Sequence, residues 1–150
     1  MLPRPQEIEN LLKLVDAPLK EATPDSNRID GYRQNAADFL RAAQRTDDAP
    51  VVRYTAAYEG TFMLAMCLPS AYGVRTSDKP GHRSIAFGLM INRLWSADAG
   101  VYKTLMDAHK VRNAAICDSP VPRVTHTQAQ ALAELLHDAL LRIDRSLASG

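Results

Sequence analysis

The chain has 150 residues, the usual length of one domain, so we expect a single domain over residues 1–150. Its composition, 46% hydrophobic and 23% charged, is typical of a globular protein and excludes a disordered or collagen-like chain. The formal net charge of +1 excludes a strong overall field that would recruit nucleic acid or an anionic membrane. Any nucleic-acid binding must therefore come from a local cluster.

Cysteine, histidine and apolar content exclude several further classes. Cys67 and Cys117 are too few for a disulfide framework and lack the paired spacing of a zinc site, which favours a reducing, cytoplasmic location. Eighteen apolar residues never run together, so we expect no membrane contact. The four histidines have no carboxylate at ligand spacing, and the sequence therefore implies neither a metal nor another cofactor.

Apolar residues recur at helical spacing in almost every segment, whereas alternating strand patterns are nearly absent. The first helix is predicted to start after Pro5 and to continue its apolar face to Leu19, with Pro18 kinking or ending it. A turn at residues 23–26 then precedes a second helix that ends near Arg45.

The third helix is predicted to start near Pro50 and to end before Pro69. Gly60 weakens this helix by about 1 kcal/mol relative to alanine unless another element packs closely there. Tyr54 and Tyr58 lie one turn apart, and we interpret them as core or interface aromatics rather than base-stacking platforms.

Polar, turn-forming residues from 70 to 81 predict a loop after the third helix. Three more helices are predicted, the first over residues 82–95 and the second over about 100–117. Thr125 and Thr127 can cap the last helix, which has an apolar stripe from 129 to 147. Six helices with short connections predict an all-α fold, an antiparallel bundle of four core helices plus appended helices.

The first candidate functional residue is Arg112 on the fifth helix. On a helix it shares a face with the apolar positions 115 and 116, so its guanidinium must find a partner. One interpretation pairs Arg112 with a carboxylate of a neighbouring helix or lays it over the bundle surface. The other makes it a phosphate-binding arginine in a groove between helices or between subunits.

A second candidate is the basic segment 79–83. Gly81 has no side chain and so permits a tight approach to the backbone. His82 and Arg83 would lie in the first turn of the fourth helix, where free backbone N–H groups attract an anion. The alternative interpretation is a helix cap with a solvated basic turn.

The order of these segments resembles the HEPN superfamily. A Tyr/Ala-rich helix with Leu-Ala-Met-Cys-Leu precedes Tyr-Gly-Val-Arg, then Pro-Gly-His-Arg-Ser-Ile, then a helix that contains Val-Arg-Asn. The likeness spans residues 25–118 and is sharpest at 81–83 and 112–118. It implies a helical bundle that dimerises and that acts in a toxin–antitoxin or defence system.

Active members of that superfamily cleave RNA without a metal, using an arginine, an adjacent polar residue and a histidine that face a second copy across the dimer. Arg112 and Asn113 fit the first two positions, but Cys117 takes the place of the histidine. A cysteine with its ordinary pKa of about 8.5 is a poor proton carrier near neutral pH. His109, one turn before Arg112, could approach the same groove.

The resemblance therefore implies a non-catalytic or weakly catalytic HEPN-like module that binds RNA, a nucleotide or a partner protein. Phosphate contacts would come from Arg112 and Asn113, with Lys110, His82 and Arg83 as outer contributors. Two alternatives stay open: an active metal-independent endoribonuclease that uses Arg112 with His109 or Cys117, and a purely dimerising interaction protein. The expected protein partners are a second copy of the chain and a cognate antitoxin or a nucleotidyltransferase-type protein.

Overall fold

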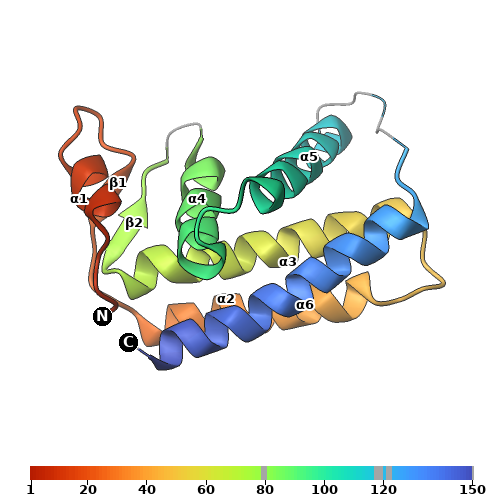
Figure 1. The fold of residues 1–150 in the computed structure, drawn as a ribbon, viewed down its shortest axis with the longest axis horizontal. Helices are drawn as coiled ribbons and strands as arrows, with labels where there is room; N and C mark the ends of the chain where they lie inside the picture. The colour runs from red at the N-terminus through yellow and green to blue at the C-terminus, as the bar shows by residue number, and fades with distance from the viewer. Residues whose placement is uncertain (79–80, 117–119, 121–122, 150) are drawn as a thin grey trace.

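The computed structural model describes residues 1–78, 81–116, 120 and 123–149. These residues form six α-helices and one two-stranded sheet, which confirms the all-α class (Figure 1). The helices are α1 (Gln6–Leu12), α2 (Ser26–Ala43), α3 (Pro50–Ala71), α4 (His82–Trp95), α5 (Ala99–Ile116) and α6 (His126–Ala148). The strands are β1 (Leu19–Glu21) and β2 (Val74–Thr76).

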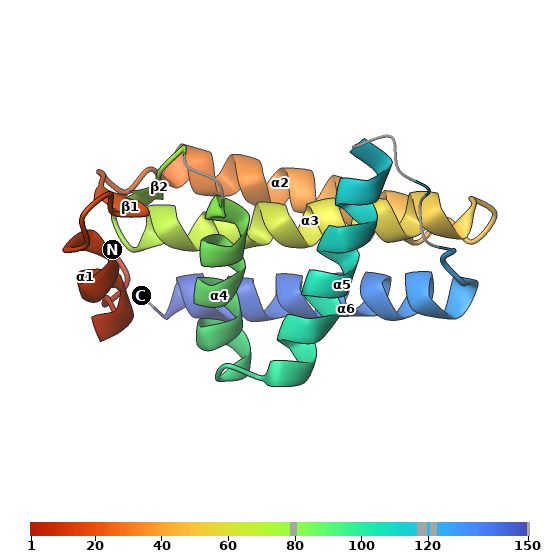
Figure 2. The ribbon, with the colours of Figure 1, turned by 90° about the horizontal axis from the view of Figure 1, so that it is seen from above.

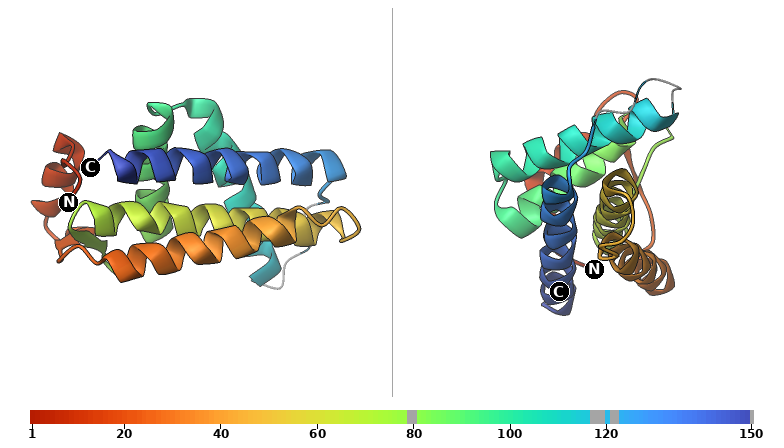
Figure 3. Two further views of the ribbon diagram at one scale, coloured as in Figure 1. Left: turned by 90° about the horizontal axis from the view of Figure 1, so that it is seen from below. Right: turned by 90° about the vertical axis from the view of Figure 1, so that its right-hand side faces the viewer.

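Three long helices, α2, α3 and α6, lie side by side and pack against one another. The end-on view in Figure 3 shows them as three neighbouring cylinders with α4 and α5 across one side. Figure 2 shows α4 and α5 running across the long helices, and both contact α3. The chain therefore brings the start of α4 and the second half of α5 to the same face of α3.

Helix α3 is the centre of the core. Fifteen of its 22 residues are buried, so it is apolar nearly all round, as a helix surrounded by others must be. Gly60 lies where α3 packs tightly against α6 and α2, since an added Cβ would lie 2.6 Å from Leu136 Cδ2 and 3.0 Å from Phe39 Cβ. The sequence predicted that Gly60 weakens the helix unless another element packs closely there, and this close packing is present. On α6 the predicted apolar stripe is buried except at Leu140 and Leu147, which are half-buried. Thr125 caps the helix together with Gln128.

Two predicted helix ends are wrong. Helix α1 ends at Leu12 rather than near Pro18, because Asp16 adopts a left-handed conformation (φ 55°) and turns the chain back. Leu19 is buried, but in β1, where it pairs with Thr76. Helix α3 continues through Pro69 to Ala71, because a buried proline near a helix end removes only one backbone hydrogen bond and its neighbours are held by packing.

The predicted loop after the third helix contains β2, which was not expected. Arg4 secures this segment: its Nε donates to the Tyr72 carbonyl at 2.8 Å, and its Nη2 donates to the Gly73 carbonyl at 2.9 Å. Gly73 has a positive φ of 72°, a conformation that favours glycine and that turns the chain from α3 into β2. The chain can then reach the start of α4 at His82, as predicted.

Candidate functional site

The structure brings the two basic segments of the sequence together on α3. Arg83 lies in the first turn of α4, and Arg112 lies in the second half of α5. Both side chains contact Glu59, which lies between them on α3. We call the group around this carboxylate the Glu59 cluster; its members are Tyr58, Glu59, Arg83, His109, Arg112 and Asn113.

One carboxylate serves two guanidinium groups. Arg112 Nε lies 3.3 Å from Glu59 Oε1, and Arg83 Nη1 lies 3.5 Å from Glu59 Oε2. The three side chains are 26%, 18% and 20% exposed for Arg112, Arg83 and Glu59. The sequence had allowed Arg112 to pair with a carboxylate of a neighbouring helix, and Glu59 is that partner. Because two positive charges face one negative charge, these three groups together retain a positive charge.

A chain of hydrogen bonds links Arg112 to the buried phenol of Tyr58. Arg112 Nη1 donates to Asn113 Oδ1 at 3.4 Å, and Asn113 Nδ2 lies 3.0 Å from His109 Nε2. With the amide held in this orientation, Nε2 accepts, so the ring proton is on Nδ1 and is donated to Tyr58 Oη at 2.7 Å. Both nitrogens of the imidazole are thus engaged within the protein.

Burial and the charges around His109 keep its ring neutral. Burial lowers the pKa of His109 below its ordinary value, and the positive charges of Arg83 and Arg112 lower it further, while Glu59 raises it. Burial also raises the pKa of Tyr58 above its ordinary value, against an opposing effect of the hydrogen bond from Arg83. At neutral pH the cluster therefore contains a neutral phenol and a neutral imidazole beside two arginines.

Aromatic contacts fix the first turn of α4. The Arg83 guanidinium lies 3.8 Å from the centre of the Phe62 ring, a cation–π contact. The ring of His82 packs against the same phenylalanine, with ring centres 6.1 Å apart. His82 is thus next to the Glu59 cluster but contacts Phe62 rather than the carboxylate. This packing places the guanidinium of Arg83 against α3 rather than free in solvent.

The other predicted site residues lie at the margin of the cluster or beyond it. Lys110 is exposed on α5. Cys117, the residue at the position of the superfamily histidine, lies outside the described residues. Among the described residues no group of three or more histidine, cysteine, aspartate or glutamate side chains could hold a metal ion.

Sequence reasoning missed Glu59, the residue that joins the two basic segments. The available signal was its position: Arg53 and Glu59 are the two charged residues in the sequence of α3, a helix otherwise made of apolar and small residues. A charge on such a helix requires a partner from another element. Tyr58 was interpreted as a core aromatic, and it is fully buried, but its hydroxyl also takes part in the cluster.

The chain was compared with protein-family models, with curated proteins and with solved structures, and none of the three comparisons gives a match.

Proposed function

We propose that the chain is a HEPN-like helical module that binds a phosphate-bearing ligand, RNA or a nucleotide, at the Glu59 cluster without cleaving it. The observation that carries this proposal is the sharing of one carboxylate by Arg83 and Arg112. Each guanidinium has five N–H donors in a planar fork, and one carboxylate cannot satisfy two such forks. The remaining donors favour an additional oxyanion, and phosphate matches the fork geometry.

The partial exposure of the two arginines supports access by a ligand. Arg112 is about a quarter exposed and Arg83 about a fifth, so each presents an edge to solvent while its stem is held by the protein. A guanidinium held in this way has lost most of its conformational freedom before the ligand arrives, which reduces the entropy cost of binding. Two positioned arginines from separate helices are therefore a better anion site than two mobile ones.

Binding without cleavage is favoured by the state of His109. An imidazole that transfers protons needs a free ring nitrogen near the reacting oxygen, yet Nδ1 faces Tyr58 and Nε2 faces Asn113. Its lowered pKa also leaves little of the protonated ring that a general acid needs at neutral pH. We therefore assign His109 a positioning role, because through Asn113 it orients the guanidinium of Arg112.

The likeness of the motif order to the HEPN superfamily is the second support for the proposal. It adds further expectations, namely a homodimer, a role in a toxin–antitoxin or defence system, and an antitoxin or nucleotidyltransferase-type partner. Light scattering of the purified chain tests the homodimer directly. Among the described residues no helix has the length and apolar character needed to cross a bilayer.

The test is a titration of a labelled single-stranded oligoribonucleotide, and separately of ATP, in the presence of a chelator. We expect saturable binding that weakens as salt rises. Arg112→Gln should weaken binding about tenfold or more, since a charge-assisted hydrogen bond contributes roughly 1.5–3 kcal/mol. Arg45→Gln removes an exposed arginine that is not a member of the cluster and serves as the matched control.

Two results would overturn the proposal. Equal affinities of the Arg112→Gln variant and the unaltered protein would show that the cluster is only a structural ion pair. Cleavage of the oligoribonucleotide that is lost in Arg112→Gln would instead establish a metal-independent endoribonuclease.

A further inference from the structure

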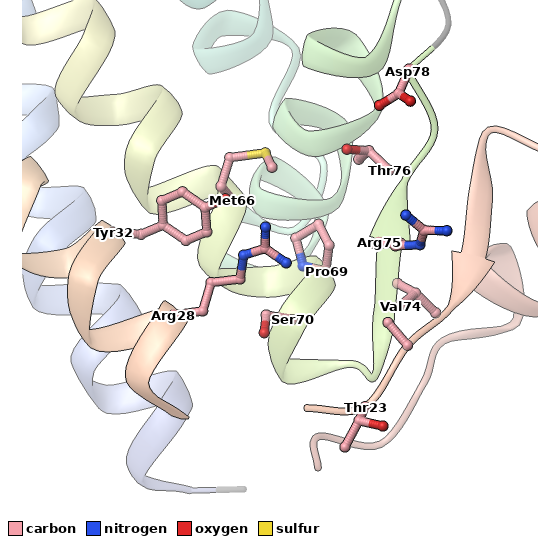
Figure 4. A pocket seen from close by; sticks show the side chains of 11 residues that line it. Thr23, Arg28, Tyr32, Met66, Pro69, Ser70, Val74, Arg75, Thr76 and Asp78 are labelled. Atoms are coloured by element: carbon pink, nitrogen blue, oxygen red, sulfur yellow. The ribbon is translucent and has the colours of Figure 1, made fainter. Parts of the chain in front are cut away.

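A second basic site, separate from the Glu59 cluster, lies between the start of α2, the end of α3 and β2. It is a cavity of about 210 Å³, which we call the Arg28–Arg75 pocket. Its polar lining includes Thr23, Arg28, Tyr32, Ser70, Arg75 and Thr76. Figure 4 shows Arg28 reaching from α2 to a position between the Tyr32 ring and Pro69, with Arg75 on β2 across the pocket.

Neither arginine of this pocket has an internal partner in the described part of the chain. The side chains of Arg4, Arg33, Arg41, Arg142 and others form ion pairs there, whereas those of Arg28 and Arg75 form no ion pair or hydrogen bond with the described residues. Both are exposed to solvent, and two unpaired guanidinium groups that line one cavity give it a positive potential that attracts an anion.

The register of the small sheet adds a further positive charge beside Arg75. Lys20 on β1 lies directly opposite Arg75 on β2, and both are exposed. Side chains that are directly opposite in an antiparallel pair share a face of the sheet, and like charges there destabilise the pairing. An anion bound at Arg75 would relieve this repulsion, so the sheet and the pocket indicate the same kind of ligand.

Hydroxyl groups complete the lining. Thr23, Tyr32, Ser70 and Thr76 each bring one hydroxyl to the pocket. Ser70 Oγ accepts a hydrogen bond from the backbone N–H of Asp25 at 3.4 Å, which leaves its own proton to donate. Hydroxyl donors with two guanidinium groups form a set that matches the oxygens of a phosphate.

Size and charge select the ligand class. The volume of about 210 Å³ is below the roughly 300–1,000 Å³ that drug-sized ligands occupy, so a small group fits and the remainder of a larger ligand stays outside. Asp78 is the acidic side chain among the described lining residues, and it offsets one of the two positive charges. It would repel an anion at the rim, so the ligand must contact both arginines, as a tetrahedral dianion can.

We propose that the Arg28–Arg75 pocket binds a phosphate monoester, the terminal phosphate of a nucleotide or of a nucleic acid strand. This inference does not depend on the proposed function, because no residue of the Glu59 cluster lines the pocket. Arg28 and Arg75 bind the phosphate oxygens from opposite sides, and the hydroxyl groups donate to those that remain. The rigid frame is α2 and α3, whose packing fixes Tyr32 and Ser70 relative to each other.

The test is a two-dimensional amide NMR titration with inorganic phosphate at constant ionic strength, with chloride as the reference anion. We expect saturable shifts of the backbone amides around residues 26–32 and 74–76. Arg28→Gln and Arg75→Gln should each weaken phosphate binding about tenfold. Both residues are exposed, so these variants should stay folded, which circular dichroism checks. Arg45→Gln is the matched control and should bind as the unaltered protein does.

Competition identifies the source of the phosphate. Adenosine 5′-monophosphate and a 5′-phosphorylated tetraribonucleotide are compared as competitors of phosphate. If the two displace phosphate equally well, the ligand is a free nucleotide. Much tighter binding of the 5′-phosphorylated strand than of its 5′-hydroxyl form indicates a strand end. Absence of saturable shifts, or shifts unchanged in Arg28→Gln and Arg75→Gln, would overturn the proposal. Loss of these shifts in Arg112→Gln would also overturn it, because the two sites would then not be separate.

Discussion

Arg83 and Arg112, which come from different helices, contact different oxygens of the same Glu59 carboxylate. Glu59 therefore acts as an internal anion in the position that a ligand phosphate would approach. This arrangement keeps the two arginines in place when no ligand is bound. It also opposes the ligand, because the carboxylate repels a second negative charge. The balance between these two effects can be measured.

The first prediction concerns removal of this internal anion. Glu59→Gln should tighten oligoribonucleotide binding about five- to tenfold, since one repulsive charge near the ligand is removed at intermediate dielectric. The same change should lower the free energy of unfolding by about 1 kcal/mol, because both arginines lose their charged partner. Fluorescence anisotropy and urea denaturation measure the two effects.

The matched control for that variant is Glu134→Gln, an exposed glutamate on α6. This variant also removes one negative charge, but at a residue outside the cluster. It should leave both the oligoribonucleotide affinity and the free energy of unfolding nearly unchanged. If Glu59→Gln bound RNA more weakly than the unaltered protein, the carboxylate would be a ligand contact and not a competitor.

The second prediction is a pH dependence of stability from His109. Its pKa is lowered in the folded state, first by burial and then by Arg83 and Arg112, so below its ordinary pKa of about 6.5 the unfolded chain binds a proton that the folded chain does not. The stability that the neutral ring contributes is present above pH 6.5 and is lost as the pH falls toward the folded-state pKa. His109→Gln should remove this loss.

Urea denaturation at a series of pH values from 7.5 to 5 checks the prediction. The difference in unfolding free energy between the unaltered protein and His109→Gln should shrink as the pH falls through this window. His137→Gln, at an exposed histidine on α6, is the control. A difference that stays constant with pH would mean that His109 titrates at its ordinary pKa.

Most of the fold could be predicted from the sequence because helical periodicity and caps are local signals. The spacing of apolar residues located all six helices and gave the bounds of α4, and a capping residue gave the start of α6. The strands were missed because three-residue strands are too short to show alternation. Their pairing depends on the left-handed turn at Asp16 and on the contacts of Arg4, which periodicity does not record.

The candidate site was predictable in part. The basic segments around Arg83 and Arg112 were identified separately, but their meeting at Glu59 depends on how α4 and α5 cross α3. Side-chain spacing along one helix does not determine a crossing between helices. The Arg28–Arg75 pocket was missed for the same reason, since α2 and β2 supply one arginine each and neither segment has a distinctive motif.

The third prediction concerns the tight helix contact at Gly60. Gly60→Ala should destabilise the fold by about 1–3 kcal/mol despite alanine's better helix propensity, because its Cβ would lie 2.6 Å from Leu136 and 3.0 Å from Phe39. Gly31→Ala, on an open face of α2, should stabilise by about 0.5–1 kcal/mol. Thermal denaturation of the pair measures both. Stabilisation by Gly60→Ala would mean that α3 and α6 pack less closely than described.

The fourth prediction concerns a buried cation. Arg53 is 2% exposed and donates to the Ala43 carbonyl at 2.9 Å and to Gln130 Oε1 at 2.6 Å. Arg53→Met should destabilise by about 1–3 kcal/mol, since it leaves the Ala43 carbonyl at the end of α2 and Gln130 Oε1 on α6 without this donor. Arg41→Met, at an exposed arginine on α2, is the control for urea denaturation. An unchanged denaturation midpoint would mean that water replaces the guanidinium.

The fifth prediction tests the central claim, that Arg83 and Arg112 together bind a phosphate-bearing ligand. The measurement is the affinity of one labelled oligoribonucleotide for the unaltered protein, Arg83→Gln, Arg112→Gln and the double variant over a series of salt concentrations. Each single change should weaken binding about tenfold. It should also reduce the slope of the logarithm of affinity against the logarithm of salt concentration by about one, the effect of losing one phosphate contact. A double variant with the affinity and salt slope of the unaltered protein would contradict the account.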